Sequence, residues 1–178
     1  EHTPNGRLLV FDPITQKTTT LLSGLYFANG VALSSDESFV LVNETLMYRI
    51  QKYWLKGDKA GTSEIFIENL PGFPDNVSSN EEGIFWVALF NPRNNFVEMS
   101  SNKPFLRKIV LRLPELLQPQ PVNHSFVLGL NEDGKVVHNL QYQANEAYSP
   151  ITSVKQYNDI LYFGSLTHPG WGKIEVPK

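Results

Sequence analysis

Residues 71–89 read PGFPDNVSSNEEGIFWVAL, and in this stretch an Asp-Asn pair stands shortly before an apolar run. The run at residues 84–89 has the length and the aromatic and aliphatic content of a buried strand. A loop containing Pro and Gly leads into Asp75 and Asn76, so the simplest interpretation of the pair is a turn. A second interpretation arises because the arrangement recurs.

Three segments share one order of residues: a polar pair or Asn-Gly, a Val, a short polar turn and an apolar strand. They are residues 29–42, 75–87 and 152–163. Val31 and Val77 are 46 residues apart, which is a period typical of propeller blades or another repeat array. Val77 and Val154 are 77 residues apart, or one period plus an insertion of about 31 residues. Equivalent positions in propeller blades face one channel, so the polar pairs are expected to converge there.

The composition is that of a globular protein, with 178 residues, 41% hydrophobic and 12% aromatic. Fewer than four periods fit into the chain, whereas closed propellers have roughly four to eight blades. The sequence opens without a Met and enters a strand at residues 7–11. We therefore expect a part of a longer protein whose remaining blades lie outside these residues.

The charge pattern argues against nucleic-acid binding, because the formal net charge is −3 and Lys and Arg form no block. No stretch approaches the roughly 18 apolar residues of a membrane-spanning helix, and no signal peptide is visible. Cys is absent, which excludes disulfides, thiolate catalysis and Cys-bound zinc.

Three N-x-S/T sequons occur, and they begin at Asn43, Asn76 and Asn123. They would accept a glycan only in a eukaryotic secretory setting, and their alternative interpretation is chance. Asn76 belongs to the predicted internal site, where a glycan would not fit.

The insertion at residues 91–121 contains apolar residues at helical spacing over residues 104–117. An amphipathic helix in an all-β array has to bury its apolar stripe, and we expect it to form a lid over one end of the channel. A helix that caps exposed core, or one that docks on a membrane surface through Arg107, Lys108 and Arg112, is an open alternative.

Several blocks resemble the strictosidine synthase-like family, which includes plant strictosidine synthase and the animal adipocyte plasma membrane-associated protein. They are NGVALS at residues 29–34, KYWLKGDKAGTSE at 52–64, LPGFPDNV at 70–77 and FWVAL at 85–89. The resemblance covers nearly the whole chain. It implies that residues 1–178 form the C-terminal part of a single all-β domain, a six-bladed β-propeller, and contain roughly its last three to four blades. It also implies that the helical insertion lies over the active-site end.

The resemblance extends to calcium-dependent lactonases of similar fold and implies that Asn29, Asp75 and Asn76 are ligands of a Ca²⁺ ion. Further ligands would precede Glu1. Calcium takes six to eight oxygen ligands and accepts carboxylate and amide oxygens together. Such an ion would polarise an ester or lactone carbonyl. The alternative is that the three side chains only hydrogen-bond across the channel and hold the blades in register.

Three further residues are catalytic candidates. The resemblance places Thr152 where strictosidine synthase uses a Glu, and Thr cannot exchange a proton near neutral pH as a carboxylate does. Glu146 is a nearby carboxylate that could substitute. His168, in the turn after the last apolar strand, is a candidate base or substrate contact, or a structural residue. Glu44, at the end of its strand, is a candidate acid that supports the site from behind its direct ligands, or a channel-lining group.

Three functions follow as hypotheses. The first is a calcium-dependent ester or lactone hydrolase, of the arylesterase or lactonase kind, acting on a small apolar substrate in the channel. The second is a strictosidine synthase-type lyase that condenses an amine with an aldehyde, which needs an acid at or near Thr152. The third is a non-catalytic binding or scaffold propeller. Membrane association through the 104–117 helix or an upstream anchor, and the cellular compartment, are left open.

Overall fold

The computed structural model describes residues 3–93, 105, 112 and 122–177, and the strands in these residues form four antiparallel sheets. The first sheet is a hairpin of β1 (Gly6–Asp12) and β2 (Lys17–Leu25). The second contains β3 (Ala28–Leu33), β4 (Phe39–Glu44), β5 (Arg49–Trp54) and β6 (Ser63–Ile67), with the short 3-10 helix η1 (Thr45–Met47) after β4. The all-β class predicted from the sequence is confirmed.

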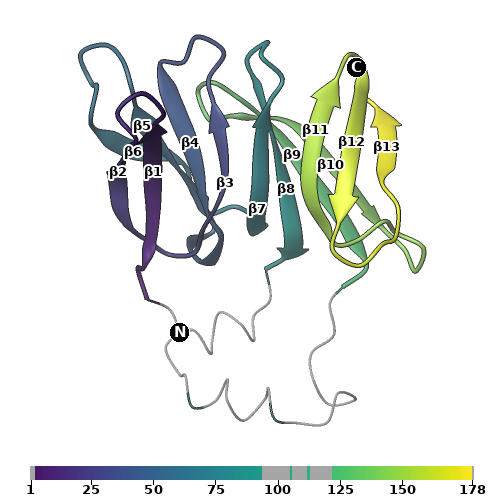
Figure 1. Cartoon of the computed structure of the whole chain (residues 1–178). Coiled ribbons are helices and arrows are strands. Elements are labelled where there is room, and N and C mark those ends of the chain that lie inside the picture. Colours follow the sequence, from purple (N-terminus) through teal and green to yellow (C-terminus); the bar gives the residue numbers. More distant parts are fainter. Residues whose placement is uncertain (1–2, 94–104, 106–111, 113–121, 178) are drawn as a thin grey trace.

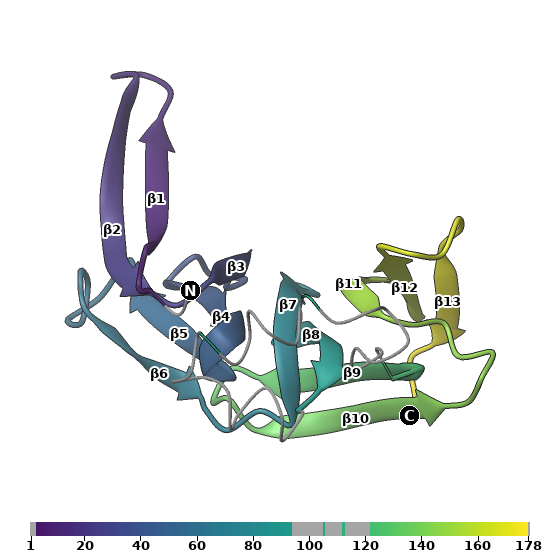
Figure 2. The same cartoon turned by 90° about the horizontal axis from the view of Figure 1, so that it is seen from below.

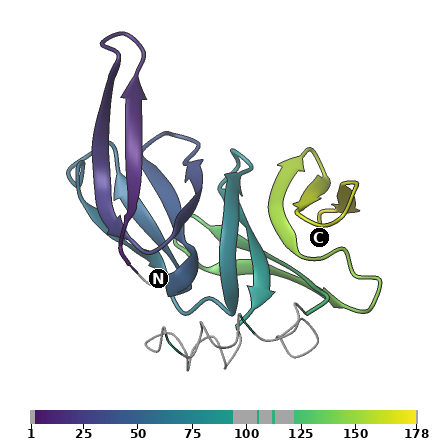
Figure 3. The same cartoon turned by 60° about the horizontal axis from the view of Figure 1, so that its bottom comes forward.

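The remaining strands form two more sheets. The third sheet contains β7 (Gly72–Ser79), β8 (Ile84–Pro92), β9 (His124–Asn131) and β10 (Val136–Gln143). The fourth contains β11 (Ile151–Tyr157), β12 (Ile160–Ser165) and β13 (Gly172–Glu175). Each sheet follows the chain as a meander, and Figures 1 and 3 show the sheets succeeding one another in chain order.

The first strands of the three larger sheets gather on one side of the molecule. Seen from below in Figure 2, the sheets radiate outward from β3, β7 and β11, and β3 packs against β7 while β7 packs against β11. This is the arrangement of propeller blades around a channel. The sequence units at residues 29–42, 75–87 and 152–163 are confirmed as the inner strand, turn and second strand of one blade each. The number of six blades stays a prediction.

The core lies between the blades, and β8 contributes to both sides of its sheet. Phe85, Val87 and Leu89 join a buried cluster shared with the β3–β6 blade. Trp86 and Ala88 join another cluster, shared with the β11–β13 blade. A strand that is buried on both faces has no solvent-facing positions, which explains why IFWVAL reads as a continuous apolar run.

A buried lysine links two blades at their outer side. Lys52 of β5 is 7% exposed, and its Nζ lies 4.1 Å from the centroid of the Phe39 ring and 4.7 Å from that of Phe66. Nζ also donates to the carbonyl of Glu132, in the β9–β10 turn of the next blade, at 3.1 Å. Burial lowers the pKa of Lys52, although nearby carboxylates act in the opposite direction.

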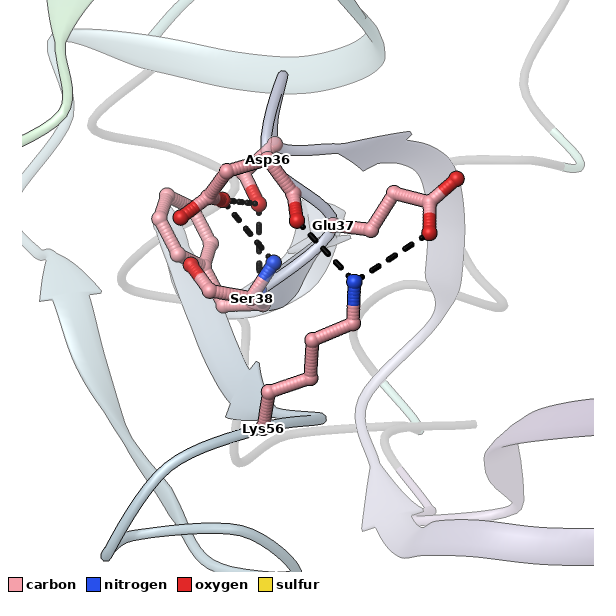
Figure 4. A network of polar contacts seen from close by, with 6 residues as sticks. Asp36, Glu37, Ser38 and Lys56 are labelled. Carbon is pink, nitrogen blue, oxygen red and sulfur yellow. Dashed lines mark hydrogen bonds and ion pairs between the residues drawn. The ribbon is translucent and has the colours of Figure 1, made fainter.

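The turn after β3 is stabilised by one carboxylate, as Figure 4 shows. Asp36 Oδ1 accepts the backbone N–H of Ser38 and the hydroxyl of Ser34, each at 2.9 Å. These bonds, the one from the Ser38 backbone first, lower the pKa of Asp36 to about 2. Lys56 Nζ donates to the Asp36 carbonyl at 3.1 Å and lies 3.3 Å from the Glu37 carboxylate. The turn that the sequence predicts here is therefore fixed by local hydrogen bonds.

The insertion connects β8 to β9, and the predicted helix at residues 104–117 lies outside the described residues apart from two single positions. Both flanks, the end of β8 and the start of β9, lie at the end of the blades where β7 begins, because β8 runs antiparallel to both β7 and β9. In the described part of the chain no helix is long and apolar enough to cross a bilayer.

We expect Gly30→Ala to destabilise the protein, because β3 approaches β7 too closely for a side chain at this position. A Cβ on Gly30 would lie 2.5 Å from the Cα of Asn76 and 2.6 Å from the backbone N of Val77. Backbone atoms cannot swing away, so the free energy of unfolding should fall by about 1–3 kcal/mol. The measurement is the denaturant midpoint of the full-length protein. Gly170→Ala, which meets no atom within 4 Å, is the matched control, and equal midpoints for the two variants would contradict the close approach.

Candidate functional site

The polar pairs lie where the inner strands lose their regular register. Pairing with the second strand shifts at equivalent points of the three blades, namely between Ala28 and Val31 in β3, between Pro74 and Val77 in β7, and between Ile151 and Ser153 in β11. A bulge bends the strand locally and re-aims its side chains. Asn29, Asp75, Asn76 and Thr152 all fall within these irregularities, which lets their polar groups meet between neighbouring blades.

The three predicted metal ligands form one hydrogen-bonded group. Asn29 Nδ2 donates to Asp75 Oδ1 at 2.9 Å, across the boundary between two blades. Asn76 Nδ2 donates to the same oxygen at 3.3 Å and to the carbonyl of Thr152, on the third inner strand, at 2.8 Å. The predicted convergence of the polar pairs is therefore confirmed, since the Asn29–Asp75 bond spans 46 residues and the bond from Asn76 to the Thr152 carbonyl spans 76.

Two residues that support the site, Asn43 and Thr45, were not identified as site residues from the sequence. Asn43 is 0% exposed and donates through Nδ2 to the Asp75 carbonyl at 2.8 Å. Thr45 Oγ1 donates to the Pro74 carbonyl at 2.6 Å and accepts from Asn29 Nδ2 at 3.3 Å. Together they attach the end of β4 to the backbone of β7 beside the Asp75 side chain. Their signal in the sequence is weak, because two polar residues after an apolar strand are usually a turn.

Asp75 is a half-buried carboxylate, and among the residues that the structure describes no Lys, Arg or His forms an ion pair with it. Burial raises the pKa of Asp75, and the hydrogen bond from Asn29 acts in the opposite direction without cancelling the rise. Among the described residues, the Asp75 carboxylate is therefore balanced by amide donors alone and by no cationic side chain. A bound cation would compensate the charge of this carboxylate.

The donor set suits a hard cation. The N–H groups of Asn29 and Asn76 are used in bonds to Asp75, Thr45 and Thr152, and among the described residues no donor bonds to the amide oxygen of either side chain. Calcium accepts this mixture of carboxylate and amide oxygens. Within the described ranges no group of three or more His, Cys, Asp or Glu could hold a metal ion. A metal at this site would depend on the two asparagines.

Glu44 lies in a buried ion pair, and a catalytic role for it stays a prediction. Its side chain is 0% exposed, and its carboxylate accepts the Tyr26 backbone N–H at 2.9 Å, the Gln51 amide at 2.8 Å and the Arg49 guanidinium. Burial tends to raise the pKa of Glu44, but these donors, Arg49 foremost, lower it overall. Glu44 therefore forms a satisfied ion pair with the neighbouring strand of its own blade, and it lies on the sheet face opposite to Asn43.

Thr152 and His168 differ in their relation to the cluster. Thr152 reaches it through its carbonyl, while its hydroxyl donates to the Gly164 carbonyl at 3.3 Å within its own sheet. His168 is exposed in the turn after β12, and its ring lies 4.7 Å from that of Tyr148, measured between centroids. Tyr148 also donates to the carbonyl of Gly170 at 2.7 Å, which holds this turn in place. A catalytic role for His168 stays a prediction.

Solved structures with the same architecture include three that match at low sequence identity. A luciferin-regenerating enzyme aligns with a TM-score of 0.58 and 18% identity, covering 90% of this chain and 44% of that chain. A gluconolactonase from Xanthomonas campestris aligns with a TM-score of 0.57 and 14% identity, covering 88% of this chain and 40% of that chain. A calcium-binding protein, regucalcin from Agrobacterium tumefaciens, aligns with a TM-score of 0.56 and 15% identity, covering 94% of this chain and 47% of that chain. These matches support the propeller fold.

Sequence comparison identifies closer relatives. The family model for strictosidine synthase matches residues 1–58. The Arabidopsis thaliana protein strictosidine synthase-like 10 is 41% identical over 179 residues, which covers 96% of this chain and 47% of that protein. The rat adipocyte plasma membrane-associated protein is 34% identical over 175 residues, 95% of this chain and 46% of that protein. The chain belongs to the strictosidine synthase-like family and spans about half the length of these relatives.

Proposed function

We propose that this chain contributes the metal-binding half of a calcium-dependent ester or lactone hydrolase. The observation that carries the proposal is Asp75, a half-buried carboxylate without a cationic partner among the described residues, joined to Asn29 and Asn76 from two inner strands. A gluconolactonase and a calcium-binding regucalcin among the structures of similar fold support it. The remaining ligands and the substrate contacts would come from the rest of the protein.

The chemistry assigns distinct roles to the residues. Asn29, Asp75 and Asn76 would hold the ion, and calcium supplies a Lewis acid that polarises the carbonyl of a bound ester or lactone. Asn43 and Thr45 hold the backbone on which Asp75 is carried, so the carboxylate keeps its position. A small substrate would enter from the end of the blades at which β7 begins. His168 is the described residue best suited to move a proton there, because its exposed imidazole lies at the same end.

The strictosidine synthase-type lyase has less support from the geometry. No acid occupies position 152, and the hydroxyl of Thr152 is directed to the Gly164 carbonyl. The nearby carboxylate Glu146 is exposed, and the hydrogen bond from Tyr142 lowers the pKa of Glu146, which makes it a weaker proton donor near neutral pH. The hydrolase is the function that the site supports best.

Calcium should stabilise the full-length protein, and Asp75→Asn should abolish that stabilisation. A ligand that binds only the folded state raises the free energy of unfolding by about 2.7 kcal/mol at a concentration 100 times its Kd. The measurement is the thermal midpoint with and without calcium. Asp58→Asn, a substitution in an exposed turn, is the matched control and should keep the full shift. A calcium-dependent shift that persists in Asp75→Asn would place the ion elsewhere.

Without metal, Asp75→Asn should stabilise the protein at neutral pH and have little effect in acid. The folded-state pKa of Asp75 is raised, so its contribution to stability is greatest below the unfolded pKa and is lost as pH rises through the folded pKa. The Asn variant stays neutral and avoids this loss. Chemical denaturation of the metal-free protein between about pH 3 and pH 8 measures the difference. If the gap between the two proteins does not widen with pH, the charge of Asp75 is compensated in solution.

The full-length protein should hydrolyse an aryl ester or a lactone, and a calcium chelator should abolish turnover. Asp75→Asn should lower kcat/KM by about 10²-fold or more, because the group that stabilises the developing oxyanion would be lost. Asp58→Asn should retain the original rate. Calcium binding without turnover would identify a binding propeller. The absence of both binding and turnover in a folded protein would leave the polar cluster as a hydrogen-bond network that holds the blades in register.

A further inference from the structure

The three sequons of the chain differ in what the fold leaves accessible. They begin at Asn43, Asn76 and Asn123. In N-glycosylation the side-chain amide nitrogen bonds to the first sugar, so the folded protein must leave Nδ2 free and leave room for a large polar group at the surface. Each asparagine can be tested against both conditions.

Asn43 fails both conditions. Its side chain is 0% exposed at the end of β4, and Nδ2 donates to the Asp75 carbonyl of the neighbouring blade at 2.8 Å. A sugar on this nitrogen would break that bond and separate β4 from β7. The fold therefore excludes a glycan at Asn43.

Asn76 fails for a related reason. Its Nδ2 donates to the Thr152 carbonyl at 2.8 Å and to Asp75 Oδ1 at 3.3 Å, so it lies between two inner strands that pack against each other. A glycan there would replace the contact between β7 and β11. The prediction from the sequence that Asn76 lies in an internal site agrees with these contacts.

Asn123 meets both conditions. It is exposed immediately before β9, and among the described residues its Nδ2 has one hydrogen-bond contact, a long one of 3.4 Å to the Asn145 carbonyl. The neighbouring Val122 is also exposed, at 44%. The hydroxyl of Ser125, the third sequon residue, donates to the Tyr148 carbonyl at 2.9 Å. This bond exists in the folded protein, so it does not prevent a glycan from being added to Asn123 before folding. The backbone at Asn123 thus presents the amide outward.

The position of Asn123 also keeps a glycan away from the polar cluster. The start of β9 lies at the end of the blades where β7 begins, but β9 is separated from β7 by β8. Neighbouring strands are about 4.8 Å apart, so a group attached before β9 starts roughly 10 Å outward from β7. A glycan there would shield the outer part of this end of the blade and leave the inner strands clear.

We propose that Asn123 is an N-glycosylation site and that it is the one of the three sequons that carries a glycan in the folded protein. The oligosaccharide is transferred from a lipid pyrophosphate donor of the secretory pathway. The Nδ2 of Asn123 loses one proton and forms a bond to the anomeric carbon of the first sugar, while the bond from that carbon to the pyrophosphate oxygen breaks and the lipid pyrophosphate leaves. The proposal does not depend on the hydrolase function.

The test is the mass of the full-length protein produced with its own targeting signals in plant or insect cells. We expect a glycopeptide that contains Asn123 and a mass decrease on treatment with a peptide N-glycosidase, which converts the modified Asn to Asp. Asn123→Gln and Ser125→Ala should each remove the glycan, whereas Ser125→Thr, which preserves the sequon, should retain it. Asn43→Gln should leave the glycan in place.

Two results would overturn the proposal. One is a folded full-length protein that carries no glycan at Asn123. The other is a glycan that persists in Asn123→Gln and maps to Asn43 or Asn76, because the contacts described for these two residues would then be absent from the folded protein.

Discussion

The close approach of β3 to β7 at Gly30 is the constraint on which the candidate site depends. With no side chain at this position, the backbone of one blade contacts the backbone of the next, and a Cβ would overlap the main chain of Asn76. That contact brings Asn29 to within hydrogen-bonding distance of Asp75. The requirement for Gly in the Asn29-Gly30 pair is thus steric, and the requirement for Asn is chemical. The same contact between β3 and β7 therefore packs the two blades together and assembles the polar cluster.

Three carboxylates show why Asp75 stands apart. Asp36 is in an exposed turn and is satisfied by N–H and O–H donors, which lower its pKa to about 2. Glu44 is buried, but a guanidinium, an amide and a backbone N–H surround its carboxylate. Asp75 is half-buried, has amide donors on one oxygen, and has a raised pKa. Among the described residues, Asp75 is thus the one of these three acids whose pKa is raised, and this contrast is the reason for proposing it as a metal ligand.

The sequence predicts the repeat well because the repeat follows local rules. Turn residues and a continuous apolar run are both properties of a short window, so the unit around Asp75 could be recognised and matched to the units at Asn29 and Thr152. The contacts of Lys52 could not be predicted from the sequence, because its aromatic neighbours and the Glu132 carbonyl are brought together only by blade packing. The same holds for Asn43, whose partner lies 32 residues away in another blade. Glu44 lies one position beyond Asn43, and the alternation of the strand directs it to the opposite face.

The contact at Thr152 shows which part of the site does not depend on the identity of a side chain. Asn76 is held by the Thr152 carbonyl, an atom that every residue type supplies. The side chain at that position hydrogen-bonds elsewhere, to the Gly164 carbonyl, and takes no part in the link. A different side chain at position 152 would leave the carbonyl that holds Asn76 in place. The position of Asn76 therefore depends on the backbone at residue 152 and not on the side chain there.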